Sequence, residues 1–206
     1  MARSISVKNL YDKKFKTFPF IGIYSKAMGM PETNGAWLVW GAEKNGKTWF
    51  ALMLAQYISQ FEKVLYISAE EGTGKDFVEA CKRAGIEPDN THLKFDEYLA
   101  LDELEQKISK RKSAKVIVID NCTIYADELK AAKLRQLLQK HSDKLFIFIA
   151  HEEKKEPYTA IAKLVRKLAK IIMHVQGLTA QISGRCPGGV ISIDEEKSQI
   201  YWGSTP

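Results

Sequence analysis

Short apolar runs alternate with longer amphipathic segments along most of the chain. Apolar runs of strand length, bounded by turn or charged residues, lie at residues 36–40, 64–68, 115–120 and 144–150. Between them, apolar residues recur with helical spacing, which predicts helices at residues 47–61, 74–86, 101–112, 126–141 and 159–170. Because strands alternate with helices, the pattern predicts an α/β fold with a mostly parallel central sheet flanked by helices.

The C-terminal part has a different pattern. Short strands joined by glycine turns are predicted at residues 171–176, 178–183, 189–194 and 198–202. We expect these strands to be antiparallel and to form one edge of the sheet. No repeat or low-complexity linker divides the chain, so we expect one domain over residues 35–206 and an N-terminal extension, residues 1–34, that packs on this core.

One loop carries a specific motif. Residues 41–48, Gly-Ala-Glu-Lys-Asn-Gly-Lys-Thr, match the phosphate-binding P-loop (Walker A) pattern G-x-x-x-x-G-K-[ST] between a predicted strand and a predicted helix. The glycines let backbone N–H groups surround a phosphate, and the N-terminus of the helix favours the same negative charge. We expect Lys47 to reach the β- and γ-phosphates of ATP and the Thr48 hydroxyl to bind Mg²⁺. The predicted nucleotide contacts are Gly41, Ala42, Glu43, Lys44, Asn45, Gly46, Lys47, Thr48 and Trp49.

Acidic residues at two strand ends complete the chemistry that a P-loop needs. Asp120 ends the apolar run "VIVID", which matches the Walker-B pattern, and we expect it to coordinate Mg²⁺ through water. Glu70 and Glu71 follow the strand at residues 64–68, where a carboxylate can activate the attacking water. We favour Glu70 over Glu71 as the catalytic base, and so expect an ATP hydrolase.

Composition adds limits rather than a function. The formal net charge of +6 is a mild bias toward polyanions. The three cysteines, Cys81, Cys122 and Cys186, have neither disulfide-framework nor zinc-site spacing, which suits a reducing cytoplasmic setting. No apolar run is long enough to cross a bilayer, so we expect no membrane partner.

The order of these motifs resembles the core of the RecA-like ATPases, which include the recombinases, the bacterial RadA and DnaB proteins, and small phage or mobile-element relatives. The resemblance covers about residues 35–202 and is specific in the order of elements rather than in residue identity. It implies that Glu70 is the catalytic base and that His151, after the strand "FIA", senses the γ-phosphate. The segment "GRCPGG" is similar to a DnaB-type motif in which an arginine, here Arg185, acts on the nucleotide of a neighbouring subunit. Ser183 stands where that motif has lysine.

The resemblance also implies a partner. In RecA-like proteins, the loop after the sensor strand faces single-stranded nucleic acid, and here that region is basic. The candidate contacts with single-stranded DNA are Lys154, Lys155, Lys163, Arg166 and Lys167. A solvated helix face is the alternative interpretation of the same residues. The aromatic residues of the N-terminal extension suit either covering a sheet edge or contacting adenine.

The sequence thus favours a Mg-ATP-hydrolysing, RecA-like ATPase that acts on DNA in recombination, annealing or replication, as a homo-oligomeric ring or filament. The main alternative is a nucleotide-switched regulatory or partition-type ATPase that does not remodel DNA. Partition proteins usually carry an additional lysine early in the P-loop, and Trp40-Gly41-Ala42 does not match. A small-molecule kinase would need an arginine-rich lid, for which no compact candidate exists.

Overall fold

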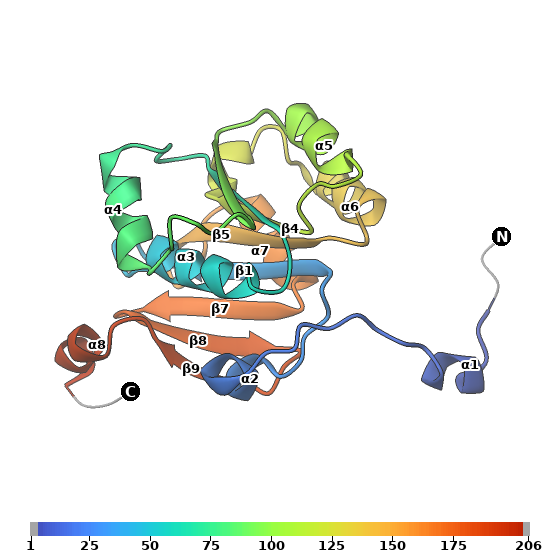
Figure 1. Ribbon diagram of the computed structural model, residues 1–206, viewed down its shortest axis with the longest axis horizontal. Helices are drawn as coiled ribbons and strands as arrows, with labels where there is room; N and C mark the ends of the chain where they lie inside the picture. The colour runs from blue at the N-terminus through green and yellow to red at the C-terminus, as the bar shows by residue number, and fades with distance from the viewer. Residues whose placement is uncertain (1–3, 204–206) are drawn as a thin grey trace.

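The computed structural model describes residues 4–203, and its centre is one twisted sheet (Figure 1). Over these residues the sheet has nine strands, in the spatial order β3-β2-β4-β5-β1-β7-β8-β9, with β6 paired to β5. The strands are β1 (Gly35–Gly41), β2 (Val64–Ser68), β3 (Leu93–Glu97), β4 (Val116–Asp120), β5 (Leu145–Glu153), β6 (Glu156–Pro157), β7 (Ile171–Gln176), β8 (Thr179–Gly184) and β9 (Gly189–Ser192).

The pairing confirms the predicted fold class. Strands β3, β2, β4, β5, β1 and β7 pair with one another in parallel. Strands β8 and β9 continue the sheet as antiparallel strands at its edge. Strands β2 and β4 are buried at every position, as expected for strands covered on both faces.

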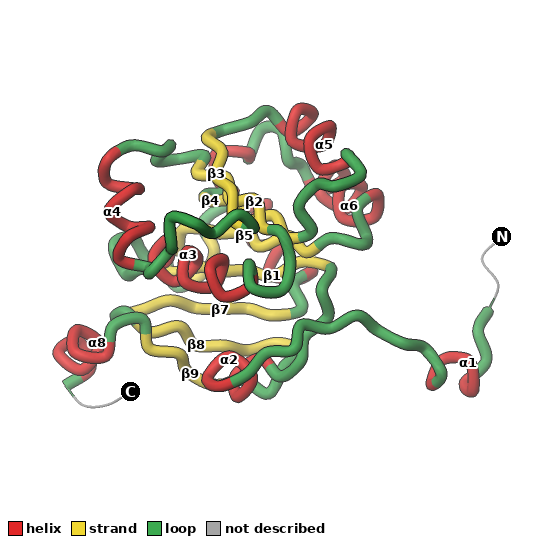
Figure 2. Tube along the Cα trace, viewed as in Figure 1, coloured by secondary structure: helices red, strands yellow, loops and turns green. Residues whose placement is uncertain are grey.

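Helices cover both faces of the sheet (Figures 1 and 2). One apolar layer joins the sheet to α3 and α4 through residues such as Phe50 and Phe77. The other joins it to α5, α6 and α7 through residues such as Leu104, Leu134 and Val165. The helices are α1 (Val7–Tyr11), α2 (Gly22–Met28), α3 (Lys47–Ile58), α4 (Lys75–Arg83), α5 (Leu101–Ser109), the 3₁₀ turn η1 (Cys122–Tyr125), α6 (Ala131–Lys140), α7 (Ala160–Leu168) and α8 (Glu195–Trp202).

Three local predictions were wrong. Residues 198–202 belong to helix α8 rather than to a strand, because Asp194 accepts a hydrogen bond from the Lys197 amide and caps the helix. Helix α5 stops at Ser109, so the bases at 110–112 lie in a loop. Helix α6 begins only at Ala131, since Glu128 upstream accepts a hydrogen bond from the Leu101 amide at the start of α5.

Strand β3 was missed by the sequence analysis. It alternates Leu93 and Phe95 with polar residues over only five positions, a weak signal beside the long apolar runs. Strand β3 forms the edge of the sheet next to β2.

The N-terminal segment lies against the core from residue 17 onward. Phe18 and Phe20 are buried and stack with ring centroids 5.3 Å apart. Phe18 also meets the Trp37 ring edge-on at 6.2 Å and lies 6.5 Å from Phe61. These aromatic residues cover the sheet beside α3 and lie outside the P-loop cavity. Residues 4–15, including α1, extend away from the body (Figure 1).

Replacing Phe18 by alanine tests whether the N-terminal extension stabilises the core. Phe18 is 0% exposed, and removing a buried phenyl ring should lower the free energy of unfolding by about 3 kcal/mol. Urea denaturation measures the change. Phe15→Ala is the matched control, because Phe15 is 61% exposed and its loss should change the free energy by less than about 0.5 kcal/mol. Equal effects of the two substitutions would contradict the packing role.

Among the helices of the described residues, none combines the length and the apolar character that a bilayer crossing requires.

Candidate functional site

The candidate site lies at the edge of the sheet where the parallel strands β1, β2, β4 and β5 end. In open α/β sheets, ligands bind at this carboxyl edge. A cavity of about 580 Å³ opens there and is lined by the P-loop and by residues from the next strand ends. Its lining includes Lys47, Thr48, Glu70, Asp120 and His151, so the topology brings together five residues that the sequence analysis selected.

The P-loop, residues 41–48, needs its glycines for close packing. A Cβ on Gly41 would lie 2.1 Å from the carbonyl oxygen of Val175. Gly46 has a φ of 95°, and a Cβ there would meet Leu178 at 2.7 Å. Asn45 Oδ1 accepts a hydrogen bond from the Gly177 amide at 2.9 Å. The loop is therefore held against the turn between β7 and β8, in a shape that larger residues could not adopt.

Lys47 is buried at the start of α3, and its Nζ donates a hydrogen bond to the carbonyl oxygen of Ala42 at 2.8 Å. Burial lowers the pKa of Lys47, while the negative charges of Asp120, Glu43, Glu70 and Glu152 act in the opposite direction. A buried ammonium group with a single carbonyl partner has capacity for further acceptors. Oxygen atoms of a bound phosphate would satisfy it.

Asp120 ends strand β4 and is buried. Burial raises the pKa of its carboxyl group to about 6, against the opposing effect of hydrogen bonds from Tyr66 and Thr48. The Tyr66 hydroxyl donates to Asp120 Oδ2 at 2.6 Å. Burying a carboxylate beside Glu70 and Glu71 is unfavourable unless a cation binds. The surroundings of Asp120 therefore suit a divalent metal ion.

Glu70 meets two polar side chains from neighbouring strand ends. His151 Nε2 lies 3.1 Å from Glu70 Oε2, and Asn121 Nδ2 donates to the same oxygen at 3.1 Å. Asn121 in turn accepts a hydrogen bond from the Thr123 amide through its Oδ1. These contacts fix the direction of the Glu70 carboxylate, whereas no side-chain hydrogen bond of Glu71 occurs within the described residues.

Trp49 also lines the cavity and contacts two cationic side chains. The Arg83 guanidinium carbon lies 5.0 Å from the centroid of the Trp49 ring, and Lys197 Nζ lies 5.5 Å from it. Arg83 comes from α4 and Lys197 from α8, so side chains of two different helices contact the residue that follows the P-loop motif. Both distances suit cation–π contacts.

The predicted nucleic-acid residues fall into different environments. Lys154 and Lys155 form the tip of the β5–β6 hairpin with φ of 52° and 62°, and both are exposed. Lys163 lies 3.5 Å from Glu156, and Arg166 lies 4.8 Å above the Trp40 ring. Lys167 is exposed on α7, one helical turn after Lys163. Arg166 is thus partly engaged within the fold, while the hairpin tip projects its charges into solvent.

Arg185 lies far from the site of its own chain. It follows strand β8, which runs antiparallel to β7 and away from the P-loop edge. Its amide donates to the carbonyl oxygen of Lys170 at 2.7 Å, and its side chain is exposed. The fold therefore separates Arg185 from Lys47, Glu70 and Asp120 of the same chain.

The site also contains residues that the sequence analysis gave no role. Tyr66 and Asn121 fix the carboxylates, and Arg83 and Lys197 reach Trp49. Tyr66 is a hydroxyl-bearing residue inside a fully buried strand, and Asn121 directly follows the Walker-B aspartate, so both carried a weak signal. Arg83 and Lys197 carried none, because only tertiary packing of α4 and α8 brings them to the cavity.

Comparison with known proteins identifies the fold. No protein-family model and no curated protein matches the chain. Among solved structures, flagellar accessory protein FlaH from Methanocaldococcus jannaschii is similar, with a TM-score of 0.64, 16% identity, and coverage of 88% of this chain and 96% of FlaH. A KaiC-like protein from the archaeon Pyrococcus horikoshii OT3 is also similar, with a TM-score of 0.62, 17% identity, and coverage of 84% and 89%. The chain therefore shares its α/β fold, with a mostly parallel central sheet, with FlaH and the KaiC-like protein.

Proposed function

We propose that this protein binds and hydrolyses Mg-ATP and acts on DNA as an oligomer. The observation that carries the proposal is the meeting of Lys47, Asp120, Glu70 and His151 around one cavity. If the P-loop pattern had arisen by chance, there would be no reason for Glu70, the buried Asp120 and His151 to lie at the same edge of the sheet. The fold that FlaH and the KaiC-like protein share with this chain is consistent with that chemistry.

The residues present fit a nucleotide triphosphate and its metal ion. Lys47 and the backbone of the P-loop would hold the phosphates, and Thr48 and Asp120 would hold Mg²⁺. A site with few protein ligands suits Mg²⁺, which keeps several of its waters. The raised pKa of Asp120, about 6, reflects a buried carboxylate whose charge a cation would neutralise. Bound Mg-ATP supplies the phosphoanhydride bond and the metal charge.

Glu70 is the proposed general base, which would accept the proton of the attacking water. Asn121 and His151 hold its carboxylate, since each lies 3.1 Å from Glu70 Oε2. His151 would release Glu70 and turn toward a γ-phosphate when one is present, because its Nε2 has no hydrogen-bond partner other than Glu70 within residues 4–203. Glu152, the next residue, contacts His174 at 2.7 Å, so a shift at His151 would be transmitted along β5.

Single-stranded DNA is the proposed polymer partner at the carboxyl edge. Lys154 and Lys155 sit three and four residues after His151, at a hairpin tip where both have positive φ. A turn with positive φ at two successive residues favours Asn-Gly, so lysine at both positions makes the turn less stable. We infer that the positive charge of these lysines, rather than the stability of the turn, is what the site requires. Lys163 and Lys167 extend this charge along α7. Phosphate groups would bind there.

We propose an oligomer because Arg185 and the N-terminal arm lie away from the P-loop site of their own chain. Arg185 is exposed at the opposite edge of the sheet. The N-terminal arm exposes apolar side chains, namely Ile5, Val7, Leu10, Tyr11 and Phe15. In a ring or filament, the arm would bury these side chains on a neighbour, and Arg185 would reach a neighbouring nucleotide. We propose recombination or annealing, as in small phage or mobile-element ATPases, as the process in which such an oligomer acts.

Steady-state hydrolysis with and without single-stranded DNA tests the enzyme proposal. We expect Mg-dependent hydrolysis that DNA stimulates, and loss of hydrolysis in Lys47→Ala. A Lys154→Glu/Lys155→Glu variant should keep basal hydrolysis and lose the stimulation, whereas Lys13→Glu/Lys14→Glu, with the same charge change on the arm, should retain both. Wild-type activity no higher than that of Lys47→Ala would refute the enzyme. Hydrolysis that DNA never affects would favour the nucleotide-switched regulatory alternative.

Sizing by light scattering tests the oligomer. We expect ATP and single-stranded DNA to produce an assembly that Arg185→Ala weakens together with its hydrolysis. Mixing Arg185→Ala with Lys47→Ala should restore part of the activity, since each protomer supplies what its neighbour lacks. A monomer under every condition would overturn both the trans role of Arg185 and the oligomer.

A further inference from the structure

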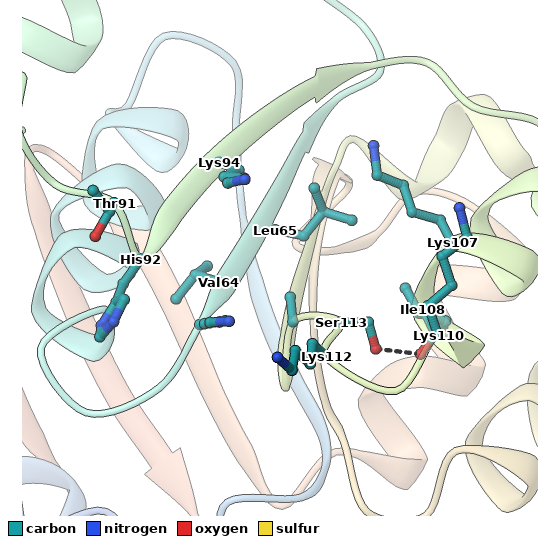
Figure 3. Close-up of a pocket in the computed structure, with 12 residues that line it drawn as sticks. Val64, Leu65, Thr91, His92, Lys94, Lys107, Ile108, Lys110, Lys112 and Ser113 are labelled. Atoms are coloured by element: carbon teal, nitrogen blue, oxygen red, sulfur yellow. Dashed lines mark hydrogen bonds between the residues drawn. The ribbon is translucent and has the colours of Figure 1, made fainter.

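A second cavity, of about 400 Å³, lies at the end of the sheet opposite the P-loop. It lies at the start of strands β2 and β4, and the C-terminal end of α5 and the loop after it form one side (Figure 3). Strand β2 has five residues, so roughly 16 Å of strand separates this cavity from the P-loop edge. The mechanism proposed above uses none of its residues.

The cavity is strongly basic. Its lining includes no acidic residue and five lysines: Lys63, Lys94, Lys107, Lys110 and Lys112. In Figure 3, Lys94 comes from β3, while Lys107, near the end of α5, and Lys110, directly after α5, lie on the other side. The register of β2 and β3 pairs Leu65 with Lys94, so these side chains share one face of the sheet. Lysines from three separate segments therefore converge on one space.

Most of this charge is not used within the fold. Lys107 pairs with Asp96, at 2.5 Å, but the other four lysines make no ion pair within residues 4–203. The surface next to the cavity adds Arg111, Lys115, Lys140 and Lys144, of which Lys115 pairs with Asp143 and Lys140 pairs with Glu105. Unpaired positive charges that lie close together repel one another and lower the stability of the folded protein. The lysine cluster at this cavity is therefore better explained by binding of an anionic ligand than by a contribution to stability.

The loop that carries Lys110 and Lys112 is fixed in place. Ser113 Oγ donates to the carbonyl oxygen of Ile108 at 2.6 Å. Lys144, which is 5% exposed, donates from its Nζ to Ser113 Oγ at 3.0 Å and to the Ala114 carbonyl oxygen at 2.8 Å. Lys110 is the C-cap residue of α5, and Lys112 follows it in the loop. The hydrogen bonds of Ser113 and Lys144 therefore hold both lysines at the cavity rim.

The inner surface of the cavity is suited to an apolar, planar group. Val64, Leu65, Ile108 and Ala114 form its apolar part, to which the methylene stems of the lysines add. His92 stands at the rim, where its Nδ1 lies 3.1 Å from the Ser59 carbonyl oxygen. A volume of about 400 Å³ is in the range of small-molecule sites. An apolar interior with a cationic rim matches a base that carries phosphates.

We propose that this cavity binds single-stranded nucleic acid, with one nucleotide inserted and the neighbouring phosphates held by the lysines. The base would lie against the apolar wall and His92, and the strand would continue over Arg111 and Lys115. The concave, partly apolar shape favours a strand over a flat anionic membrane. This site is independent of the P-loop and of the hairpin at Lys154 and Lys155, so it would bind without ATP.

Fluorescence anisotropy of a labelled oligothymidylate, with the full chain and without nucleotide, tests the proposal. We expect Lys94→Glu/Lys112→Glu to weaken binding by about tenfold or more, and to lower the slope of log affinity against log salt by about 1.4, or 0.7 for each lost contact. Lys13→Glu/Lys14→Glu makes the same charge change on the arm and should stay within about twofold of wild type. Lys94→Gln/Lys112→Gln provides the same test with less repulsion if the first variant unfolds.

Other probes separate the sources of the ligand. Unchanged oligonucleotide binding in both cavity variants would overturn the site, whatever their effect on hydrolysis. If AMP competes as well as the oligonucleotide on a molar basis, a free nucleotide rather than a strand is the ligand, and the proposal fails. It also fails if the cavity variants lose binding only to vesicles of anionic phospholipid. Loss of DNA-stimulated hydrolysis in Lys154→Glu/Lys155→Glu with intact cavity binding would show that the two sites act separately.

Discussion

Replacing Glu70 by glutamine is expected to lower the rate of ATP hydrolysis by about a thousandfold while Mg-ATP still binds, because general-base catalysis contributes about a hundred- to ten-thousandfold. Glutamine has nearly the shape of glutamate and keeps one oxygen for the hydrogen bond from Asn121 Nδ2, but it cannot accept a proton from water. Single-turnover hydrolysis measures the chemical step, and a fluorescent ATP analogue measures binding separately.

Glu71→Gln is the matched control for this prediction. Glu71 lines the same cavity and directly follows Glu70, but its side chain has no hydrogen bond within the described residues. We expect its hydrolysis rate to stay within about threefold of wild type. A larger loss in Glu71→Gln than in Glu70→Gln would reassign the base. Loss of ATP binding in Glu70→Gln would indicate that Glu70 supports the site rather than the reaction.

Replacing Asp120 by asparagine is expected to have two opposite effects. Hydrolysis should fall by about a thousandfold, since loss of the carboxylate removes the charge that would hold Mg²⁺. The nucleotide-free protein should become more stable at pH 8, because the substitution removes a buried negative charge. Thermal unfolding of the free protein measures stability, and hydrolysis over a range of Mg²⁺ concentrations measures the metal requirement.

The pH dependence of the stability gain follows from the raised pKa of Asp120. Its pKa is 3.8 when exposed and about 6 in the folded protein. Between these values, the folded state binds more protons than the unfolded state, so stability falls as pH rises. The cost of ionised Asp120 is absent below about pH 4, complete above about pH 6, and amounts to about 3 kcal/mol. Asp120→Asn should therefore stabilise the free protein at pH 8 but not at pH 4.

Asp89→Asn serves as the control for the stability measurement, because Asp89 is exposed and should change the free energy of unfolding by less than about 0.5 kcal/mol at either pH. Mg-ATP should reduce the difference between wild type and Asp120→Asn, since ligand binding stabilises only the protein that retains the site. A free wild-type protein more stable at pH 8 than Asp120→Asn would show that the fold already compensates the buried charge.

Much of the fold was predictable because its signals are local. The apolar runs of β2, β4 and β5 and the helical periodicity of α3 and α7 gave the alternation from which a parallel sheet follows. The P-loop was identified by spacing alone. The wrong assignment of residues 198–202 was avoidable, since Asp194 before the segment and Gly203 after it are helix-cap residues. The early end of α5 was not, because hydrogen bonds from Lys144 and Ser113 determine the path of the loop.

The sequence by itself determined the alternating architecture, the P-loop and the candidate carboxylates, because each depends on neighbouring residues in the chain. Tertiary structure alone decided which of these meet. Glu70 lies 81 residues from His151 and 51 from Asn121, and only the order of strands β2, β4 and β5 makes them neighbours. The basic cavity arose in the same way, since Lys63, Lys94 and Lys107 belong to three segments that face one another only after the sheet and α5 pack. The spacing of apolar residues shows which side of a segment is buried. Contacts between distant segments depend on how strands pair and helices pack, which no local sequence pattern encodes.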